Sequence, residues 1–501
     1  MESLSSAAAI TLRSFLTAQE IAVASRASCA LSTWYADTVR YYVESDPGLA
    51  SGTCISKYLR QAYGLVQWRH RNKETRSIRN KTSSVEEFHA ALAQRLSFCW
   101  VGSRENFPWS KQREGDGWGT ILNHVRAEWN LTHKHELARN LRMLPEEERG
   151  FHPESHVLTR SKSPAKSFYI YPALLKHMAR HRTWICKPGC GSCGAGVVIF
   201  DAAREAQQLS RRAGNADSAT AELTTLSALT SEQLKCALRT FLKREYPVDG
   251  EAEQEVVLQQ YIGNPFLYSG RKFDVRCYLL IASVDPLVVL WHDGYIRVCT
   301  APYDGAPLSD RRAHVTNFHV QREVGGYDAA TDTVEGMAVR APWGKFLAAI
   351  RDSPLLPTMF PAVAAGALTL EQAVREQISA VIGDSVRAAA AKLRSHAEAG
   401  PGQFALLGVD LLLDVTGKFW LIEFTKGPAY RMSPPYLEDL HTRLLHRTVD
   451  IAFQLRGDAK ALARAAKEEG AGGEGGRALR GGALPLAIRG GWEHIDCTAA
   501  L

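Results

Sequence analysis

The segment 407–425 constrains the fold most, because it predicts a β-hairpin that carries two carboxylates among apolar residues. Two apolar runs flank Thr416-Gly417, a pair typical of a tight turn between strands. A two-residue turn pairs the strands so that Asp410 lies directly opposite Glu423, with Thr425 on the face of Glu423. Facing like charges destabilise a sheet, and Mg²⁺ held between the two carboxylates would resolve this conflict. A longer turn would change the register, so the predicted pairing depends on the turn length.

A second charged strand is predicted at 270–281, where polar and apolar residues alternate with the period of two that a strand requires. The charged residues on one face are Lys272, Asp274 and Arg276. Charged groups on an otherwise apolar strand are unfavourable unless they are paired or bind a ligand. A structural ion pair and a ligand-binding cleft both satisfy this condition, and we favour the cleft.

A glycine-rich loop follows a third predicted strand in the segment 184–200. The strand ends at Lys187, and a second strand leaves the loop. The glycines of the loop are Gly189, Gly191, Gly194 and Gly196. Glycine lets backbone amides approach a phosphate closely, and the lysine adds a positive charge. The loop is not a P-loop, since no Gly-Lys-Ser/Thr precedes a helix, and a purely structural hairpin is the alternative interpretation.

Short strands alternate with helices throughout residues 151–455, which predicts a single α/β domain. A long amphipathic helix is expected at 369–394, with apolar residues recurring along one side. The small, polar and charged residues of 202–231 are interpreted as an inserted loop plus a helix.

The flanking segments are less informative. Residues 1–95 are predicted to form a helical N-terminal extension, with a basic stretch at 69–81 that is either a solvated helix face or a contact for an acidic polymer. Residues 96–150 are predicted to begin the domain, with Thr132 capping a helix. Residues 456–501 are rich in glycine, alanine and arginine, which predicts a flexible tail.

Composition excludes several classes of protein. The 10 cysteines among 501 residues are irregularly spaced, which does not resemble a disulfide framework and favours a reducing compartment. No apolar run is long enough for a transmembrane helix. The N-terminus lacks the basic region of a signal peptide, and a mitochondrial presequence has only weak support. The net charge of +7 favours an acidic partner.

Taken together, these motifs resemble the tubulin tyrosine ligase-like family. The blocks that are similar to the family's motifs, in the family's order, lie at 131–141, 151–158, 184–188, 257–262, 270–276, 293–298, 314–318, 407–410 and 420–423. One such block is a weak signal, whereas the ordered set is specific. The resemblance implies an ATP-grasp fold, an α/β (α+β) architecture with antiparallel-rich sheets flanked by helices.

The resemblance also implies a role for each matching residue, with ATP and Mg²⁺ as cofactors. The expected ATP-binding residues are Lys187, Gly194, Gly196, Gln259, Gln260, Tyr261, Ile262, Lys272, Asp274, Thr316 and Asn317. The expected Mg²⁺ ligands are Asp410, Glu423 and Thr425. The expected catalytic residues are Arg276 and Arg297, whose forked donors suit a phosphate or the carboxylate of an incoming amino acid.

Members of this family join amino acids to proteins at the expense of ATP, through an acyl phosphate. The resemblance therefore implies a ligase that adds a free amino acid, glycine or glutamate before tyrosine, to tubulin, microtubules or another acidic protein. It implies neither a nucleic acid nor a membrane as partner, and it places the protein in the cytoplasm and on the cytoskeleton, including that of a cilium or flagellum.

Three departures from the family's pattern support a second hypothesis, a weak or inactive member that binds microtubules. Thr425 stands where relatives usually have asparagine, and a hydroxyl is a poorer Mg²⁺ ligand than an amide oxygen. Cys193 stands close to the position of a basic residue in the glycine loop, and Gln260 replaces another. A rival enzyme class is suggested by the spacing of Cys186, Cys190 and Cys193, which resembles the iron–sulfur site of radical S-adenosylmethionine enzymes. Zinc is not expected there, since no fourth ligand is obvious nearby.

Overall fold

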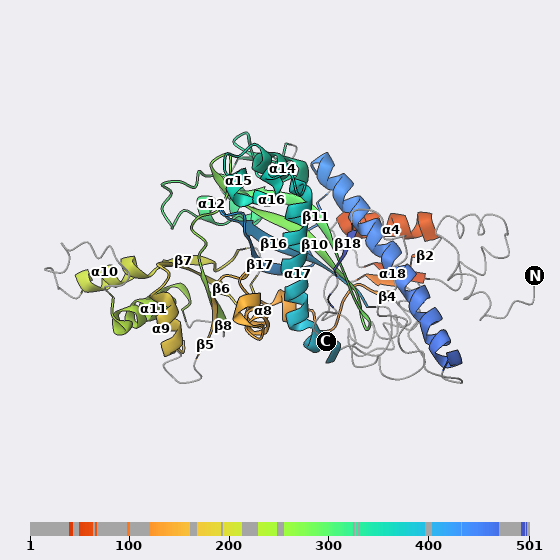
Figure 1. Cartoon of the computed structure of the whole chain (residues 1–501), viewed down its shortest axis with the longest axis horizontal. Coiled ribbons are helices and arrows are strands. Elements are labelled where there is room, and N and C mark those ends of the chain that lie inside the picture. The colour runs from red at the N-terminus through yellow and green to blue at the C-terminus, as the bar shows by residue number, and fades with distance from the viewer. Residues whose placement is uncertain are drawn as a thin grey trace, which may run out of the picture.

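The computed structural model describes residues 40–43, 50–63, 66–67, 98–100, 121–160, 168–191, 194–212, 229–247, 255–323, 326–328, 331–395, 403–431, 433–469, 492–495 and 497 (Figure 1). The basic stretch at 69–81 and Cys193 lie outside these residues. Among the described residues, none of the helices combines the length and apolar character needed to cross a bilayer.

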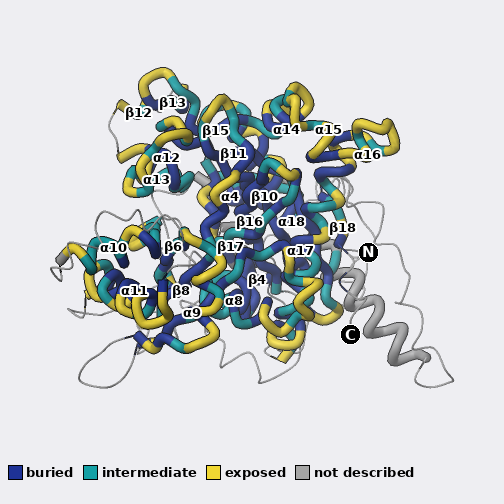
Figure 2. The backbone as a smooth tube through the Cα atoms, turned by 60° about the vertical axis from the view of Figure 1, so that its left-hand side comes forward, coloured by how far each residue is buried: buried dark blue, intermediate teal, exposed yellow. Residues whose placement is uncertain are grey.

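A large antiparallel sheet forms the centre of the molecule, and Figure 2 shows its strands as mostly buried. Its strands, in spatial order, are β15 (Arg340–Pro342), β11 (Leu287–Val298), β10 (Arg271–Val284), β16 (Ala405–Leu413) and β17 (Phe419–Lys426). Two short strands pair at its margins, β9 (Leu267–Tyr268) with β10 and β18 (Trp492–Ile495) with β11. The predicted charged strand is thus the middle of this sheet.

Two long helices cover the two faces of the central sheet. Helix α17 (Leu370–Ser395) packs against the face that carries Phe273 and Val275. Helix α18 (Pro435–Glu469) packs against the opposite face, where Tyr278 and Leu280 lie. Alternate residues of a strand point to opposite sides, so the charged residues of β10 lie on the same face as Tyr278 and Leu280. Helix α18 covers the apolar part of this face, and the charged part borders a cavity. The predicted helix at 369–394 is confirmed, and Thr369 caps it by exchanging hydrogen bonds with Gln372.

A smaller antiparallel sheet lies beside the central one, in the strand order β5-β8-β6-β7. Its strands are β5 (Ser155–Thr159), β8 (Glu255–Gln260), β6 (Thr183–Pro188) and β7 (Val198–Asp201). Three helices cover one face through an apolar cluster, and they are α9 (Pro172–Met178), α10 (Ala202–Arg212) and α11 (Ser231–Glu245). Figure 1 shows this sheet and its helices as a separate lobe. The segment predicted as an insertion starts with helix α10 and reaches the start of helix α11, whose N-cap is Thr230.

The remaining elements connect or flank these layers. They are α7 (Trp129–Thr132), α8 (Lys134–Leu141), the 3-10 helix η3 (Glu146–Glu148), α12 (Arg311–His314), α13 (Phe318–Arg322), β12 (Tyr327–Asp328), β13 (Thr333–Val334), β14 (Met337–Ala338), α14 (Trp343–Arg351), α15 (Leu356–Met359) and α16 (Pro361–Ala364). The α/β architecture with antiparallel-rich sheets flanked by helices is confirmed.

Three local predictions differ from the structure. The segment 1–95 contains helix α4 (Ala50–Tyr63) but also strands β1 (Arg40–Val43) and β2 (Val66–Gln67), which join β3 (Phe98–Trp100) and β4 (Ile121–Leu122) in a parallel sheet. The segment 456–501 also contains regular structure that was not predicted, because α18 continues to Glu469 and β18 pairs with β11. Thr132 is no cap: it ends α7, and its buried hydroxyl makes no hydrogen bond.

Candidate active site

A cavity with several charged side chains in its lining lies between the two antiparallel sheets. It is lined by thirteen of the residues predicted from the sequence, which are Lys187, Gly194, Gln259, Gln260, Tyr261, Ile262, Lys272, Asp274, Arg297, Thr316, Asn317, Asp410 and Glu423. The other three predicted residues, Gly196, Arg276 and Thr425, do not line it. Segments from both sheets, far apart in the sequence, therefore meet around one space.

Two buried lysines supply positive charge to the cavity. Lys187, in β6, donates from Nζ to Gln259 Oε1 at 2.7 Å, and burial lowers the pKa of Lys187 to about 8. Lys272, in β10, donates to the Tyr261 hydroxyl at 3.0 Å, and burial lowers its pKa as well. Each lysine is hydrogen-bonded to a neutral side chain, and removing it from water disfavours its charged form. An anion entering the cavity would reverse this effect.

A network of two arginines and two aspartates forms the central-sheet wall. Arg276 donates from Nε to Asp410 Oδ1 at 2.5 Å, and Arg297 donates to Asp410 Oδ2 at 2.6 Å. Arg297 also donates from Nε to Asp274 Oδ1 at 2.7 Å, and the Thr316 hydroxyl donates to Asp274 Oδ2 at 2.5 Å. Burial alone would raise the pKa of Asp410, but the two guanidinium groups outweigh it and hold that pKa at about 2. The strand register explains the network, since Arg276 pairs with Asp410 and Asp274 with Arg297.

The hairpin places Asp410 opposite Glu423, as predicted, but through a different turn. Asp414 closes a three-residue turn by pairing with Lys418, and Gly417 adopts the left-handed backbone conformation (φ 84°) that this turn requires. An irregularity between Asp410 and Leu411 then shifts the register by one residue and restores the expected pairing. The two-residue turn was therefore wrong, and a bulge compensates for the difference.

Protein cations already compensate both facing carboxylates, so the sheet does not depend on a metal for their balance. Arg276 and Arg297 neutralise Asp410, and Lys134 Nζ lies 3.1 Å from Glu423 Oε2. Asp410 Oδ2 accepts hydrogen bonds from both arginines, whereas Oδ1 accepts one, from Arg276 Nε, and keeps a lone pair for a further partner. Asp410 and Glu423 therefore fit a Mg²⁺ site, whereas Thr425 does not reach the cavity.

Lys134 was not predicted as a site residue, although it lies within the block 131–141. Its Nζ donates to the carbonyl of Gly191 at 2.6 Å and so joins helix α8 to the glycine loop and to Glu423. His314 also lines the cavity and pairs its Nδ1 with the Tyr261 hydroxyl at 2.9 Å. A lone lysine between two histidines gave no periodic or motif signal for such a role.

The iron–sulfur interpretation does not fit the fold. Cys186 lies in β6 with its side chain in the apolar cluster under α11, and burial raises the pKa of its thiol. Cys190 is exposed in the loop that follows β6. Because the Cys186 thiol belongs to the packed face of the small sheet, it is not available to a cluster held by the loop.

The fold and this site define a protein of the ATP-grasp class. Lys187 lies on the smaller sheet, whereas Lys272 lies on the central sheet together with Asp410 and Glu423. A sequence profile of the tubulin-tyrosine ligase family matches residues 111–348 and 360–460. The chain belongs to the tubulin-tyrosine ligase family.

Three relatives illustrate the range of this similarity. Protein polyglycylase TTLL10 of Macaca fascicularis is 27% identical over 272 residues, covering 54% of this chain and 38% of the relative. Probable tubulin polyglutamylase TTLL9 of Bos taurus is 26% identical over 432 residues, covering 80% of this chain and 85% of the relative. Inactive polyglycylase TTLL10 of Homo sapiens is 25% identical over 272 residues, covering 54% of this chain and 35% of the relative. The chain thus spans about a third of the matched TTLL10 proteins and most of the TTLL9 protein.

Proposed function

We propose that this protein is an ATP-dependent ligase that adds an amino acid, glycine or glutamate first among candidates, to an acceptor carboxylate on tubulin or another acidic protein. The observation that carries this proposal is one cavity lined both by two buried lysines, Lys187 and Lys272, and by the carboxylates of Asp410 and Glu423. Such a space suits a polyphosphate beside the lysines and Mg²⁺ beside the carboxylates.

The proposed reaction has two steps. An oxygen of the acceptor carboxylate attacks the terminal phosphorus of ATP, which gives an acyl phosphate and releases ADP. The amine of the free amino acid then attacks the acyl carbon, so that an amide forms, inorganic phosphate leaves and the amine loses a proton. Bound Mg²⁺ would supply charge neutralisation for the phosphates.

The side chains of this protein would mainly position the reactants. Lys187 and Lys272 would hold phosphate oxygens, and the backbone from Gln260 to Ile262 would border the base. Arg297 lies between Asp274 and Asp410 and lines the cavity, so it would meet the transferred phosphate or the carboxylate of the amino acid. Arg276 does not line the cavity and holds Asp410 in place, so we revise its role from catalytic to positioning.

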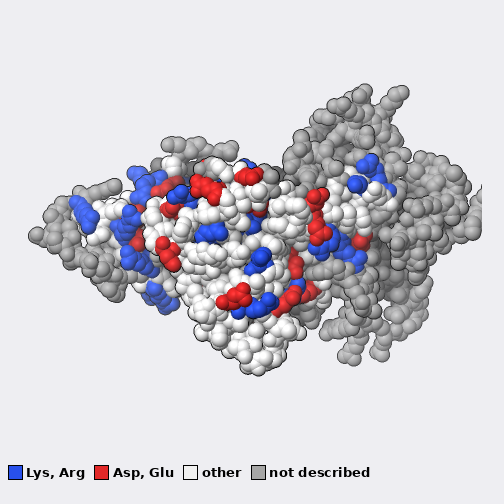
Figure 3. Space-filling view, turned by 90° about the horizontal axis from the view of Figure 1, so that it is seen from above, with Lys and Arg blue, Asp and Glu red and all other residues white. Residues whose placement is uncertain are grey.

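An acidic acceptor is supported by the surface as well as by the relatives. Exposed basic side chains on α10 and α11 are Arg204, Arg211, Arg239, Lys243 and Arg244. Figure 3 shows lysine and arginine side chains at the end of the molecule where α10 lies. Glutamate-rich tubulin tails would be attracted to such a surface. We therefore propose microtubules as the partner, and the cytoplasm and cytoskeleton, including cilia or flagella, as the location.

A second candidate function is favoured by one observation. Thr425 pairs with Gly408 in the hairpin and does not line the cavity, so two of the three expected Mg²⁺ ligands, Asp410 and Glu423, line it. A protein of this kind would bind nucleotide weakly and act by binding microtubules. A relative described as inactive shows that loss of activity occurs in this family.

A transfer assay separates the two candidates. The full chain would be incubated with ATP, Mg²⁺, microtubules and radiolabelled glycine, glutamate or tyrosine. The ligase proposal predicts ATP-dependent incorporation of one amino acid into protein, reduced at least about a hundredfold by Glu423→Gln. No incorporation above that variant, together with microtubule pelleting of the folded protein, would replace the ligase by the binding function.

A further inference from the structure

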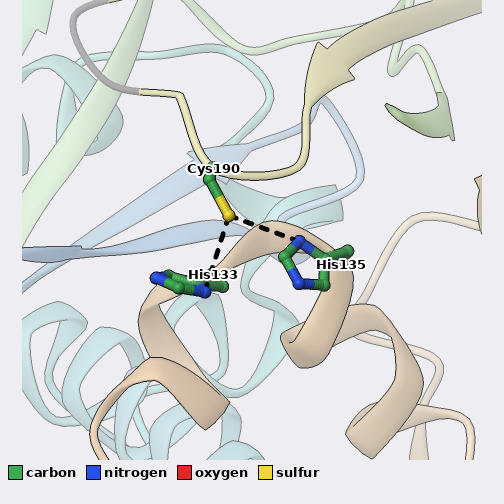
Figure 4. Close-up of side chains that lie close together, drawn as sticks. All are labelled: His133, His135 and Cys190. Atoms are coloured by element: carbon green, nitrogen blue, oxygen red, sulfur yellow. Dashed lines mark hydrogen bonds between the residues drawn. The ribbon is translucent and has the colours of Figure 1, made fainter. Parts of the chain in front are cut away.

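Three ligand-type side chains converge outside the cavity, where the glycine loop meets the start of α8 (Figure 4). Cys190 Sγ lies 3.6 Å from His133 Nδ1 and 3.8 Å from His135 Nδ1. The three atoms all lie within 4.8 Å of one another. No further metal ligand near the cysteines could be predicted from the sequence, because both histidines lie more than fifty residues earlier in the chain.

The two sulfur–nitrogen separations match those around a tetrahedral metal ion. With Zn–S of about 2.3 Å and Zn–N of about 2.0–2.1 Å, a tetrahedral angle places sulfur and nitrogen about 3.6 Å apart. The two measured sulfur–nitrogen distances lie within 0.2 Å of this value, because one is 3.6 Å and the other 3.8 Å. A thiolate with two imidazoles is a donor set that selects zinc over magnesium or calcium.

The surroundings of His135 fix its orientation toward such an ion. Its other ring nitrogen, Nε2, faces the carboxylates of Glu255 at 3.4 Å and Glu136 at 3.7 Å. A carboxylate at Nε2 places the ring proton there and leaves the lone pair on Nδ1, which is the usual support for a metal-bound histidine. Gly189 makes room for the ring, since a Cβ at that position would lie 2.6 Å from His135 Nδ1.

We propose that His133, His135 and Cys190 form a zinc site that fixes the glycine loop against helix α8, with a water molecule as the fourth ligand. The loop and the helix are already joined there, because Lys134 donates its backbone N–H to the carbonyl of Gly189 and its Nζ to that of Gly191. Lys134 also contacts Glu423 across the cavity. Zinc would therefore hold the loop in the position in which it lines the nucleotide site. The site does not depend on the proposed ligase activity.

A second cluster serves as an internal control. Glu154, just before β5, His156 in β5 and His177 in α9 also bring three ligand atoms together. This second cluster lacks a thiolate. Its side chains already contact one another, with His177 Nδ1 at 2.9 Å from Glu154 Oε1. Binding at this cluster would not involve sulfur, so the two sites have different spectra.

Metal binding to the full chain tests the proposal. Chelator-treated protein would be titrated with Zn²⁺ against a chromophoric chelator, and with Co²⁺ while its absorption spectrum is recorded. We expect one zinc ion per chain, a thiolate-to-cobalt charge-transfer band, and tetrahedral d–d bands. Cys190→Ser and His135→Ala should each weaken zinc binding at least about a hundredfold and remove the charge-transfer band. Hydrogen exchange of the loop backbone should slow on zinc binding in the wild type alone.

Matched controls make the result unambiguous. Cys236→Ser removes another exposed cysteine, and His177→Ala removes a ligand of the second cluster. Both variants should bind zinc as the wild type does. The proposal is wrong if the wild type binds no zinc, if Cys190→Ser binds it unchanged, or if only His177→Ala loses it.

Discussion

The burial of Lys187 predicts that the proposed binding of ATP depends on pH in a defined direction. In the empty protein, burial lowers the pKa of Lys187 to about 8, and its nearest partner is the neutral amide of Gln259. Polyphosphate beside the ammonium group would favour the protonated form and raise this pKa. Affinity is therefore greatest below pH 8 and falls as the pH rises through 8, because binding must then take up a proton.

The magnitude follows from linkage. One pH unit above the pKa of the free site, about a tenth of the lysines carry a proton, so the apparent Kd rises about tenfold, or by about 1.4 kcal/mol. Lys272 has a lowered pKa from the same cause and would steepen the loss at higher pH. Between pH 6 and pH 7 the Kd should change little on account of these lysines.

Isothermal titration with a non-hydrolysable ATP analogue and Mg²⁺, from pH 7 to pH 9.5, measures this dependence. Lys187→Arg keeps its charge throughout and should flatten the first part of the profile, whereas Lys187→Met should bind at least about tenfold more weakly at pH 7. Lys235→Met, in helix α11 and outside the cavity lining, is the matched control and should follow the wild type. A wild-type Kd that stays constant from pH 7 to pH 9 would refute the reasoning.

Three further substitutions probe the framework of the site. Asp410→Asn leaves Arg276 and Arg297 without full compensation in a buried network and should lower the free energy of unfolding by about 3–5 kcal/mol in urea titrations. Gly294→Ala should destabilise the protein in the same assay, since its Cβ would lie 2.1 Å from the carbonyl oxygen of Arg276. Thr425→Asn should bring a longer oxygen ligand toward the metal and lower the Mg²⁺ concentration needed for half-maximal nucleotide binding, measured by titration.

Each of these three substitutions has a matched control substitution elsewhere in the chain. Asp439→Asn breaks an exposed ion pair with Arg443 and should change the unfolding free energy by less than about 1 kcal/mol. Gly344→Ala, in helix α14 with open space around it, should stabilise rather than destabilise. Thr425→Val should not improve Mg²⁺ dependence. Equal effects of a substitution and its control would contradict the assigned contact.

Local periodicity was enough to predict the walls of the cavity. The alternation along β10 placed Lys272 and Asp274 on one face, and both line the cavity. The predicted pairing of Asp410 with Glu423 was also correct, although the bulge that produces this register could not be predicted from the residue pattern. Strand faces follow from a period of two, whereas turn lengths and bulges depend on tertiary contacts.

Contacts between segments that are distant in the sequence could not be predicted from local residue patterns. The cations that neutralise the two carboxylates come from other elements, Lys134 from α8 and Arg297 from β11. The sequence argument counted only the like charges within the hairpin and so inferred a metal as the necessary compensation. Strand β18 was likewise missed, because it is a short segment after a glycine-rich stretch and gains its partners only on the edge of β11.

Oxygen transfer from the acceptor to phosphate tests the central claim most directly. An acidic tubulin-tail peptide with heavy oxygen in its side-chain carboxylates would be incubated with the full chain, ATP, Mg²⁺ and glycine or glutamate. Mass spectrometry would follow both the peptide and the released phosphate. A ligase that acts through an acyl phosphate gives a peptide longer by one amino acid and phosphate that carries one heavy oxygen for each bond formed. Unmodified peptide, or phosphate without heavy oxygen, would contradict the account.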